Sequence, residues 1–231
     1  MIMVKAVIFD IDNTLYSYDD AHEYGWAALC DYVKAHLNMD ADTFKQEIAK
    51  AAADVKQRLN ADCAALHNRT LRFQVMLERN RLPITHAGPM GELYWDTLIR
   101  HAEPTPGSLA CLAKLKAQGY VLGIGTDMTV EYQLKKLEKL QMLPFFDFIV
   151  TSEEANVEKP NEKLFQICAM KAGVSPEECL FVGDSLKKDV LGPKAMGMPS
   201  LWYCIDPQKA AAHPEVESIS HFDQLEKLLG I

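Results

Sequence analysis

The stretch VKAVIFDIDNTLY, residues 4–16, is the most informative part of the chain. Its first eight residues, VKAVIFDI, are mostly aliphatic, β-branched or aromatic, which is typical of a buried strand. The strand ends in two acidic residues, Asp10 and Asp12, and a polar loop follows. These residues predict a buried strand that carries carboxylates at its carboxyl end.

Strand-like and helical patterns alternate through the second half of the chain. Four further stretches have the character of strands, at residues 120–126, 146–151, 179–182 and, more weakly, 199–203. Helical patterns accompany them at residues 106–118, 131–140, 161–172 and 185–196. Because such an alternation is the signature of a parallel sheet covered on both faces, we predict an α/β fold with a doubly wound, Rossmann-like sheet. Ligands of such sheets bind beyond the carboxyl ends of the strands.

Residues 16–102 interrupt this alternation. Helical stretches are visible there over residues 21–37, 43–59 and 67–81, and no convincing strand lies between them. We therefore predict a core built from residues 1–15 and 103–231, with a helical domain inserted over residues 16–102. A chain of 231 residues is long enough for such a core with a smaller inserted unit.

The charge of the chain argues against some classes of partner. The net charge is -8, from 32 acidic and 24 basic residues, and it is spread along the chain without a long block of one sign. This balance gives no electrostatic reason to bind a nucleic acid polymer or an anionic membrane. No apolar run approaches the length of about 20 residues that spans a bilayer. The oligomeric state stays open.

The cysteines and the N-terminus indicate a reducing compartment. The six cysteines are at positions 30, 63, 111, 168, 179 and 204, and none of them forms a CxxC pair. Most of them lie in apolar or helix-like surroundings. We interpret them as small buried hydrophobic residues rather than as disulfide partners. The first residues, MIMVKAVIFD, lack the long apolar region of a signal peptide. A cytoplasmic location is the simplest prediction.

Polar clusters follow the predicted strands at four places. They are residues 10–14 (DIDNT), Thr126 with Asp127, Lys159 with Pro160, and residues 183–185 (GDS) with Asp189. Each cluster alone is also typical of a solvated loop or a helix cap. Taken together and in this order, they are consistent with a single catalytic site at one edge of the sheet.

Two carboxylates from different strand ends, Asp10 and Asp184, are placed to converge on a hard cation. Mg²⁺ suits such a site because it takes few protein carboxylates, several waters and a phosphate oxygen. The cation would remove the repulsion between an anionic nucleophile and an anionic phosphate. Lys159 would supply a second positive charge, and Pro160 biases it away from helical geometry.

Asp12 and Thr126 complete the proposed chemistry. Hydrolysis through an aspartyl-phosphate requires protonation of the leaving oxygen and later activation of water, and one carboxylate with a raised pKa can do both. We expect Asp12 to have this role. Thr126 offers a hydroxyl and nearby backbone N–H groups to a phosphate oxygen.

In this order, the motifs resemble those of the haloacid dehalogenase-like hydrolase superfamily. FDIDNTLY is similar to its first motif, DxDxT, Thr126 to the second, Lys159 to the third and GDSLKKD, residues 183–189, to the fourth. The resemblance implies that Asp10 is the nucleophile and Asp12 the general acid/base. It also implies a metal held by the Asp10 carboxylate, the backbone carbonyl of Asp12 and Asp184, with Asp189 and Thr14 supporting these groups. The helical insertion resembles the family's helical cap of the first type.

Several branches of this family remain to be compared. Dehalogenases lack an aspartate at the position of Asp12, because a halide needs no proton to leave. Phosphonate cleavage needs a reactive lysine in the cap, whereas the lysines there lie in plain amphipathic helices, at positions 34, 45, 50 and 56. A sugar-phosphate mutase and a non-catalytic member that binds a phospholigand remain as alternatives. A phosphatase acting on a small phosphate monoester is the prediction that we favour.

Asp127 departs from the pattern of the family, which often has asparagine at this position. A carboxylate beside a phosphate would repel it unless the side chain points away, pairs with a cation or is protonated. The sequence does not choose among these three possibilities, and we group Asp127 with Thr126 and Lys159 as a residue of the phosphate site.

The first motif with a helical insertion resembles the nucleotidase-like group, which acts on nucleoside monophosphates and other small phosphoesters. A nucleotide or a sugar phosphate is therefore a candidate substrate. Aromatic residues near the insertion are candidates for contacts with a base or sugar, namely Tyr16, Tyr18, His22, Tyr24 and Trp26. Arg69 and Arg72 are candidates for a second anionic group, although packing or solvation explains them equally well.

Overall fold

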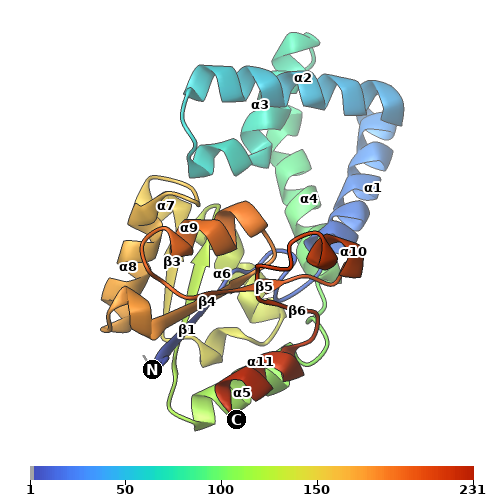
Figure 1. The fold of residues 1–231 in the computed structure, drawn as a ribbon. Coiled ribbons are helices and arrows are strands. Elements are labelled where there is room, and N and C mark those ends of the chain that lie inside the picture. The colour runs from blue at the N-terminus through green and yellow to red at the C-terminus, as the bar shows by residue number, and fades with distance from the viewer. Residues whose placement is uncertain (1–2) are drawn as a thin grey trace. The chain divides into compact units, whose positions relative to one another are not determined.

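A six-stranded parallel sheet organises the chain outside the helical insertion (Figure 1). The computed structural model describes residues 3–231. The strands are β1 (Ala6–Phe9), β2 (Val121–Thr126), β3 (Phe148–Thr151), β4 (Cys179–Gly183), β5 (Ser200–Tyr203) and β6 (Ser218–Ile219). Their order across the sheet is β3-β2-β1-β4-β5-β6, and all neighbouring pairs are parallel. The predicted α/β fold is confirmed.

The order of the strands places the first strand at the centre of the sheet. β1 pairs with β2 on one side and with β4 on the other, so the chain winds outward from β1 in both directions. The carboxyl ends of these three strands therefore meet at one edge, at the point where the winding reverses. This switch point is where open α/β sheets bind their ligands.

Helices cover both faces of the sheet. They are α5 (Ser108–Ala117), α6 (Val130–Lys139), α7 (Ser152–Ala155), α8 (Glu162–Ala172), α9 (Gly192–Lys194), α10 (Pro207–Ala211) and α11 (Phe222–Leu229). Short 3₁₀ turns precede β3 (Leu143–Phe145) and β4 (Pro176–Glu178).

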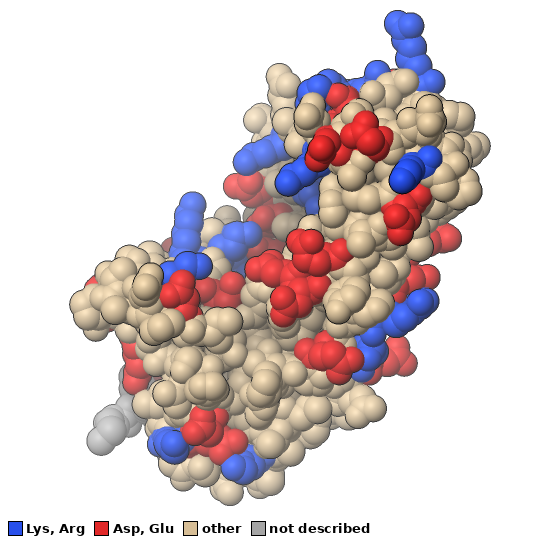
Figure 2. All heavy atoms as spheres, turned by 90° about the vertical axis from the view of Figure 1, so that its right-hand side faces the viewer, with Lys and Arg blue, Asp and Glu red and all other residues tan. Residues whose placement is uncertain are grey.

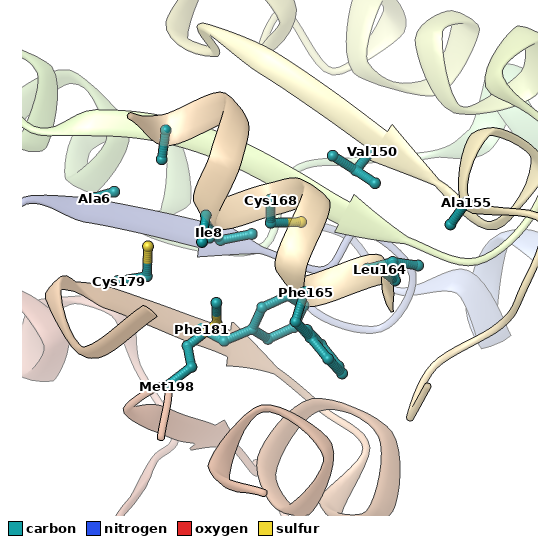
Figure 3. Packing of buried hydrophobic residues seen from close by; sticks show 12 residues of the cluster. Ala6, Ile8, Val150, Ala155, Leu164, Phe165, Cys168, Cys179, Phe181 and Met198 are labelled. Carbon is teal, nitrogen blue, oxygen red and sulfur yellow. The ribbon is translucent and has the colours of Figure 1, made fainter. Parts of the chain in front are cut away.

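Alternate residues of β1 face opposite layers. Ala6 and Ile8 point into a buried cluster with α8, in which the rings of Phe165 and Phe181 meet edge to face at 5.2 Å (Figure 3). Phe9 lies on the other face, where its ring is 6.3 Å from that of Phe222 in α11. Because each fully buried side chain of this kind contributes about 1.5–3 kcal/mol, both layers hold β1 firmly in place.

The region after β4 differs from its prediction. A single helix was expected over residues 185–196, whereas the structure has a π-helical turn, η5 (Leu186–Leu191), followed by α9. Pro193 lies at the start of α9, where a missing N–H is tolerated. Three elements near the C-terminus, α10, β6 and α11, were not predicted, and β6 has only two residues, too few to show a strand period.

The insertion contains four main helices. They are α1 (Tyr18–Leu37), α2 (Ala41–Leu59), α3 (Arg69–Arg79) and α4 (Ala87–His101), with 3₁₀ turns at Ala64–His67 and Ile84–His86. Asp40 and Asn68 cap the amino ends of α2 and α3 by accepting backbone N–H bonds. α1 packs along α4, and a Cβ at Gly25 would lie only 3.0 Å from Tyr94. A larger residue at this helix crossing would require Tyr94 to move by a few tenths of an ångström.

The two compact units divide after Ser17 and after Ala102, whereas the predicted domain boundary fell after residue 15. Tyr16 belongs to the sheet-containing unit because it forms isolated β-bridges with Asp12 and Pro104 and is fully buried. On the face that Figure 2 shows, acidic and basic side chains are interspersed. Within residues 3–231, none of the helices has the length and apolar character needed to cross a bilayer.

Candidate active site

The polar clusters of the sequence gather at the switch point of the sheet. Asp10 directly follows β1, and its backbone N–H donates to the carbonyl of Val182 in β4 at 2.9 Å. Thr126 ends β2 and Asp184 directly follows β4. The fold therefore brings three predicted site residues to neighbouring strand ends.

Lys159 lies between two carboxylates. Its Nζ is 2.8 Å from Asp10 Oδ1 and 2.7 Å from Asp189 Oδ1, and the side chain is almost completely buried. Burial opposes the charge of this ammonium group, but Asp10 and Asp189 hold its pKa above the usual value. Lys159 is consequently a fixed positive charge beside Asp10, as the sequence predicted.

Three carboxylates form a cluster that fits a hard cation. One oxygen each of Asp10, Asp184 and Asp189 lies within 4.8 Å of the others. Burial raises the pKa of Asp10 to about 8 against the attraction of Lys159, and Asp189 and Asp184 add to the rise. Burial, with Asp189, likewise raises the pKa of Asp184 to about 6. A divalent cation would stabilise the ionised forms, and an all-oxygen donor set suits Mg²⁺.

Asp189 is already engaged by the protein. Its Oδ1 accepts from Lys159, and its Oδ2 accepts from the backbone N–H of Ser185 at 2.9 Å. A Cβ at Gly183 would lie 2.5 Å from Asp189 Cγ, so only glycine at the end of β4 permits this approach. The arrangement favours Asp10 and Asp184 as the carboxylates that bind metal, with Asp189 orienting Lys159.

The surroundings of Asp12 are of a different kind. Its Oδ1 accepts from Tyr16 Oη at 2.5 Å and from Lys136 Nζ at 2.6 Å, and its Oδ2 accepts from Gln133 Nε2 at 3.4 Å. Burial would raise the pKa of Asp12, but Lys136, Tyr16 and Gln133 together hold it below its usual value. The expectation of a raised pKa for Asp12 is therefore wrong, because the sequence did not reveal that the ammonium group of Lys136 lies beside this carboxylate.

Gln133 links Asp12 to the second motif. Its Nε2 donates to Thr126 Oγ1 at 2.7 Å and to the carbonyl of Asp127 at 2.9 Å, and the side chain is fully buried. The Thr126 hydroxyl in turn donates to the Asp127 carbonyl at 3.3 Å. Gln133 thus fixes the loop after β2 relative to the loop after β1.

Both carboxylate oxygens of Asp127 have partners. Oδ1 accepts from the backbone N–H of Lys159 at 2.9 Å, and Oδ2 pairs with Lys188 Nζ at 2.8 Å. Of the three possibilities that the sequence left open, the structure shows pairing with a cation. The side chain of Asp127 thereby supports Lys159, and the loop continues through Met128, whose φ of 98° lies in the left-handed region.

Thr14 is completely buried, and its hydroxyl oxygen has no hydrogen-bond partner among residues 3–231. Its backbone carbonyl accepts from Thr105 Oγ1 at 2.9 Å, which ties the loop after β1 to the segment that returns from the insertion. No hydrogen bond from the Thr14 side chain to Asp10 or Asp12 occurs among the described residues. Its supporting role stays a prediction.

Sequence reasoning missed Gln133, Lys136 and Lys188. Gln133 and Lys136 are three residues apart on α6 and thus share one face of the helix, yet the leucine stripe of this helix was the only pattern interpreted. Lys136 is fully buried. A lysine is almost never fully buried unless it is paired, and Lys136 pairs with Asp12. A polar pair at helical spacing directly after the second motif was the available signal.

The aromatic candidates of the sequence separate into different surroundings. Tyr16 binds Asp12, whereas Tyr24 stacks on His101 with ring centroids 4.1 Å apart and is largely exposed. Tyr24 and the remaining candidates all lie within the helical unit, the latter being Tyr18, His22, Trp26, Arg69 and Arg72.

Known proteins resemble this chain over most of its length. A family model described as haloacid dehalogenase-like hydrolase matches residues 4–197. A glyceraldehyde 3-phosphate phosphatase of Methanopyrus kandleri is 34% identical over 204 residues, which cover 85% of this chain and 82% of the relative. A pyrimidine 5'-nucleotidase of Escherichia coli is 26% identical over 225 residues, covering 95% of this chain and 96% of the relative.

Among solved structures, the crystal structure of a HAD phosphatase from Thermococcus onnurineus is similar, with a TM-score of 0.77 and 26% sequence identity. The similarity covers 98% of both chains. It therefore includes the helical insertion as well as the sheet.

Proposed function

Because the chain belongs to the haloacid dehalogenase-like hydrolase family and is a hydrolase of phosphoric monoesters, we propose that it works through an aspartyl-phosphate on Asp10 with Mg²⁺ as cofactor. The observation that carries the proposal is the convergence of Asp10, Asp184 and Lys159 at the switch point of the sheet. A buried nucleophile, two acidic neighbours and a fixed cation are the parts that this chemistry requires.

In the first half-reaction the Asp10 carboxylate attacks phosphorus, and the bond between phosphorus and the ester oxygen breaks. Asp12 donates its proton to the leaving oxygen, which departs as an alcohol. Lys159, the Thr126 hydroxyl and the backbone around Asp127 bind the phosphoryl oxygens. Mg²⁺, held by Asp10, the backbone carbonyl of Asp12 and Asp184, would supply positive charge that offsets the repulsion between carboxylate and phosphate.

In the second half-reaction Asp12 accepts a proton from water, which attacks phosphorus and releases inorganic phosphate and the free Asp10 carboxylate. The ionised state that Lys136 favours in Asp12 is the state that a general base needs. For the first half-reaction Asp12 must be protonated. The negative charge of a bound phosphate dianion raises the pKa of Asp12 and so favours its protonated form.

The proposed substrate is a small phosphate monoester, either a sugar phosphate or a nucleoside monophosphate. A relative that acts on glyceraldehyde 3-phosphate supports the first class, and a relative that is a pyrimidine 5'-nucleotidase supports the second. Asp12 favours phosphoester hydrolysis over halide removal, because only an ester oxygen needs a proton to leave. We further propose that the helical insertion is the cap of this enzyme.

We also propose a reducing, cytoplasmic setting. All six cysteines are unpaired, and four of them are buried. This pattern fits small apolar residues that need no oxidising compartment.

The test is phosphate release from p-nitrophenyl phosphate and a panel of sugar phosphates and nucleoside monophosphates, with Mg²⁺ or with EDTA. We expect turnover only with Mg²⁺. Acid quenching during turnover should trap a hydroxylamine-sensitive phosphoryl group on the peptide that contains Asp10. Binding without turnover over the whole panel would favour a non-catalytic member, and formation of an isomeric sugar phosphate would favour a mutase.

A further inference from the structure

A cavity of about 190 Å³ lies within the helical unit, lined by side chains from all four of its main helices. Its polar lining consists of His22 of α1, Arg69 and Arg72 of α3, and Tyr94 of α4. Its apolar lining includes Trp26 of α1, Ile48 of α2 and Phe73 of α3. None of the catalytic residues proposed above belongs to this cavity.

Arg69 is a charged group with incomplete pairing. Its Nη2 donates to Tyr18 Oη at 2.6 Å, and its guanidinium carbon lies 5.3 Å from the centroid of the Tyr94 ring. Its Nε is buried and has no hydrogen-bond partner among residues 3–231. None of the ion pairs within residues 18–102 joins Arg69 to a carboxylate.

The neighbours of Arg69 are held in place without neutralising it. Tyr94 Oη is 2.9 Å from Tyr18 Oη and 2.8 Å from His22 Nδ1, so three helix residues form one hydrogen-bonded group beside the guanidinium. Burial, with the charge of Arg69, holds the pKa of His22 below its usual value, so His22 adds no second cation. A partly buried guanidinium without a counter-ion costs free energy, and an anionic ligand would recover it.

The size and lining of the cavity define the rest of the ligand. An apolar cavity of about 150 Å³ is sufficient to hold benzene. The present cavity is slightly larger, and the indole ring of Trp26 is fixed by stacking on Phe44 with centroids 4.9 Å apart. Space for a ring-sized apolar body therefore lies beside the incompletely paired guanidinium of Arg69.

We propose that this cavity is a binding site for a small organic monocarboxylate whose ring-sized apolar body packs against Trp26, Ile48 and Phe73. The carboxylate pairs with Arg69, because a planar guanidinium matches the two oxygens of a carboxylate. The apolar lining favours an organic anion of this kind over inorganic phosphate. The inference is independent of the proposed phosphatase chemistry.

The test uses the full chain with Mg²⁺ and titrates phenylacetate by isothermal calorimetry, with 2-phenylethanol as the neutral probe of matched shape. We expect saturable binding of one phenylacetate per chain, at least tenfold tighter than that of the alcohol. Arg69→Met should weaken phenylacetate binding at least tenfold. The matched control is Arg79→Met on the same helix, whose guanidinium pairs with Asp54 at 2.5 Å, and it should bind like the wild type.

A second variant keeps the test decisive if Arg69→Met does not fold. Ala52→Leu adds volume to the cavity wall from α2 and should abolish binding while the circular dichroism spectrum is retained. Saturating inorganic phosphate should not displace phenylacetate. Equal affinity for acid and alcohol, unchanged binding in folded Arg69→Met or Ala52→Leu, or displacement by inorganic phosphate would each overturn the proposal.

Discussion

The two halves of the candidate active site place the same kind of group in opposite surroundings. Asp10 and Asp12 are two residues apart in the loop after β1. Asp10 lies in a buried cluster with two other carboxylates, and its pKa rises to about 8. Asp12 lies beside Lys136 and two further hydrogen-bond donors, and its pKa falls below the usual value. The difference shows that the partners delivered by other elements, rather than the local motif, set the charge of each carboxylate.

The different surroundings of Asp10 and Asp12 match the different roles that we propose for them. The carboxylates around Asp10 come from the end of β4 and from η5, and they create a place where a divalent cation is favourable. The donors around Asp12 come from α6 and from Tyr16, and they orient one carboxylate without a metal. If Asp10 and Asp12 have these different roles, substitutions around each of them should change the kinetics in distinguishable ways.

The largest effect is expected from Asp10→Asn. The amide is a poor nucleophile, so turnover of every substrate should fall by at least about 10⁴-fold. The loss should be equally severe for substrates with good and poor leaving groups, because no phosphoryl acceptor remains. Initial rates of phosphate release measure the effect, and substantial turnover by the folded variant would show that another group is the nucleophile.

Asp12→Asn should give a smaller loss that depends on the leaving group. General acid catalysis contributes about 10²–10⁴-fold, and it matters most when the leaving oxygen is basic. We expect kcat/KM for an alkyl phosphate to fall by about this factor. With 2,4-dinitrophenyl phosphate, whose leaving group needs no proton, kcat/KM should change far less. Equal losses for both substrates would remove the distinction between the two carboxylates.

Lys136→Met tests the cation beside Asp12 alone. Without Lys136 the Asp12 carboxylate keeps only Tyr16 and Gln133 as donors, so its orientation becomes less defined. We expect kcat/KM for alkyl phosphates to fall about tenfold, from loss of part of the acid–base term. The matched control is Lys135→Met, which removes the adjacent lysine of an exposed pair with Glu131. Identical kinetics in the two variants would assign Lys136 a role in packing only.

The sequence predicted one half of the site better than the other. Asp10, Lys159 and Asp184 were predicted because each follows a recognisable strand or precedes a helix, and parallel strands end at the same edge. Gln133 and Lys136 lie inside an amphipathic helix, where a polar residue is ordinarily a solvated one. Only the three-dimensional packing of α6 shows that both are fully buried.

The same limit applies to the fold. The strands of the sheet centre carry enough apolar residues to be seen, whereas β6 has two residues and depends on pairing with β5. α4 was missed because Gly88, Pro89 and Gly91 lie in its first turns and weaken the helical pattern. Proline is nevertheless tolerated in the first turn of a helix, and the buried face of α4 is completed by Tyr94 and Leu98.

The last expected effect concerns stability rather than turnover, and it is a pH dependence that belongs to Asp10 and not to Asp12. The folded-state pKa of Asp10, about 8, lies above the unfolded value of 3.8, so the folded protein binds this proton more tightly. Its contribution is fully present below about pH 4 and is lost as the pH rises toward 8, by at most about 1.4 kcal/mol per pH unit for one proton. The lowered pKa of Asp12 makes its own contribution constant over this window.

In EDTA, the melting temperature of the wild type should therefore fall relative to that of Asp10→Asn between pH 5 and pH 8. Mg²⁺ should stabilise the wild type more at pH 8 than at pH 5, because the cation binds the ionised carboxylates and competes with protons. Lys135→Met, which changes an exposed pair with Glu131 and leaves the surroundings of both carboxylates intact, should keep the wild-type slope. Differential scanning fluorimetry of the three proteins at both pH values measures this. A constant difference between wild type and Asp10→Asn would show that Asp10 is ionised throughout, and the two carboxylates would then be electrostatically alike.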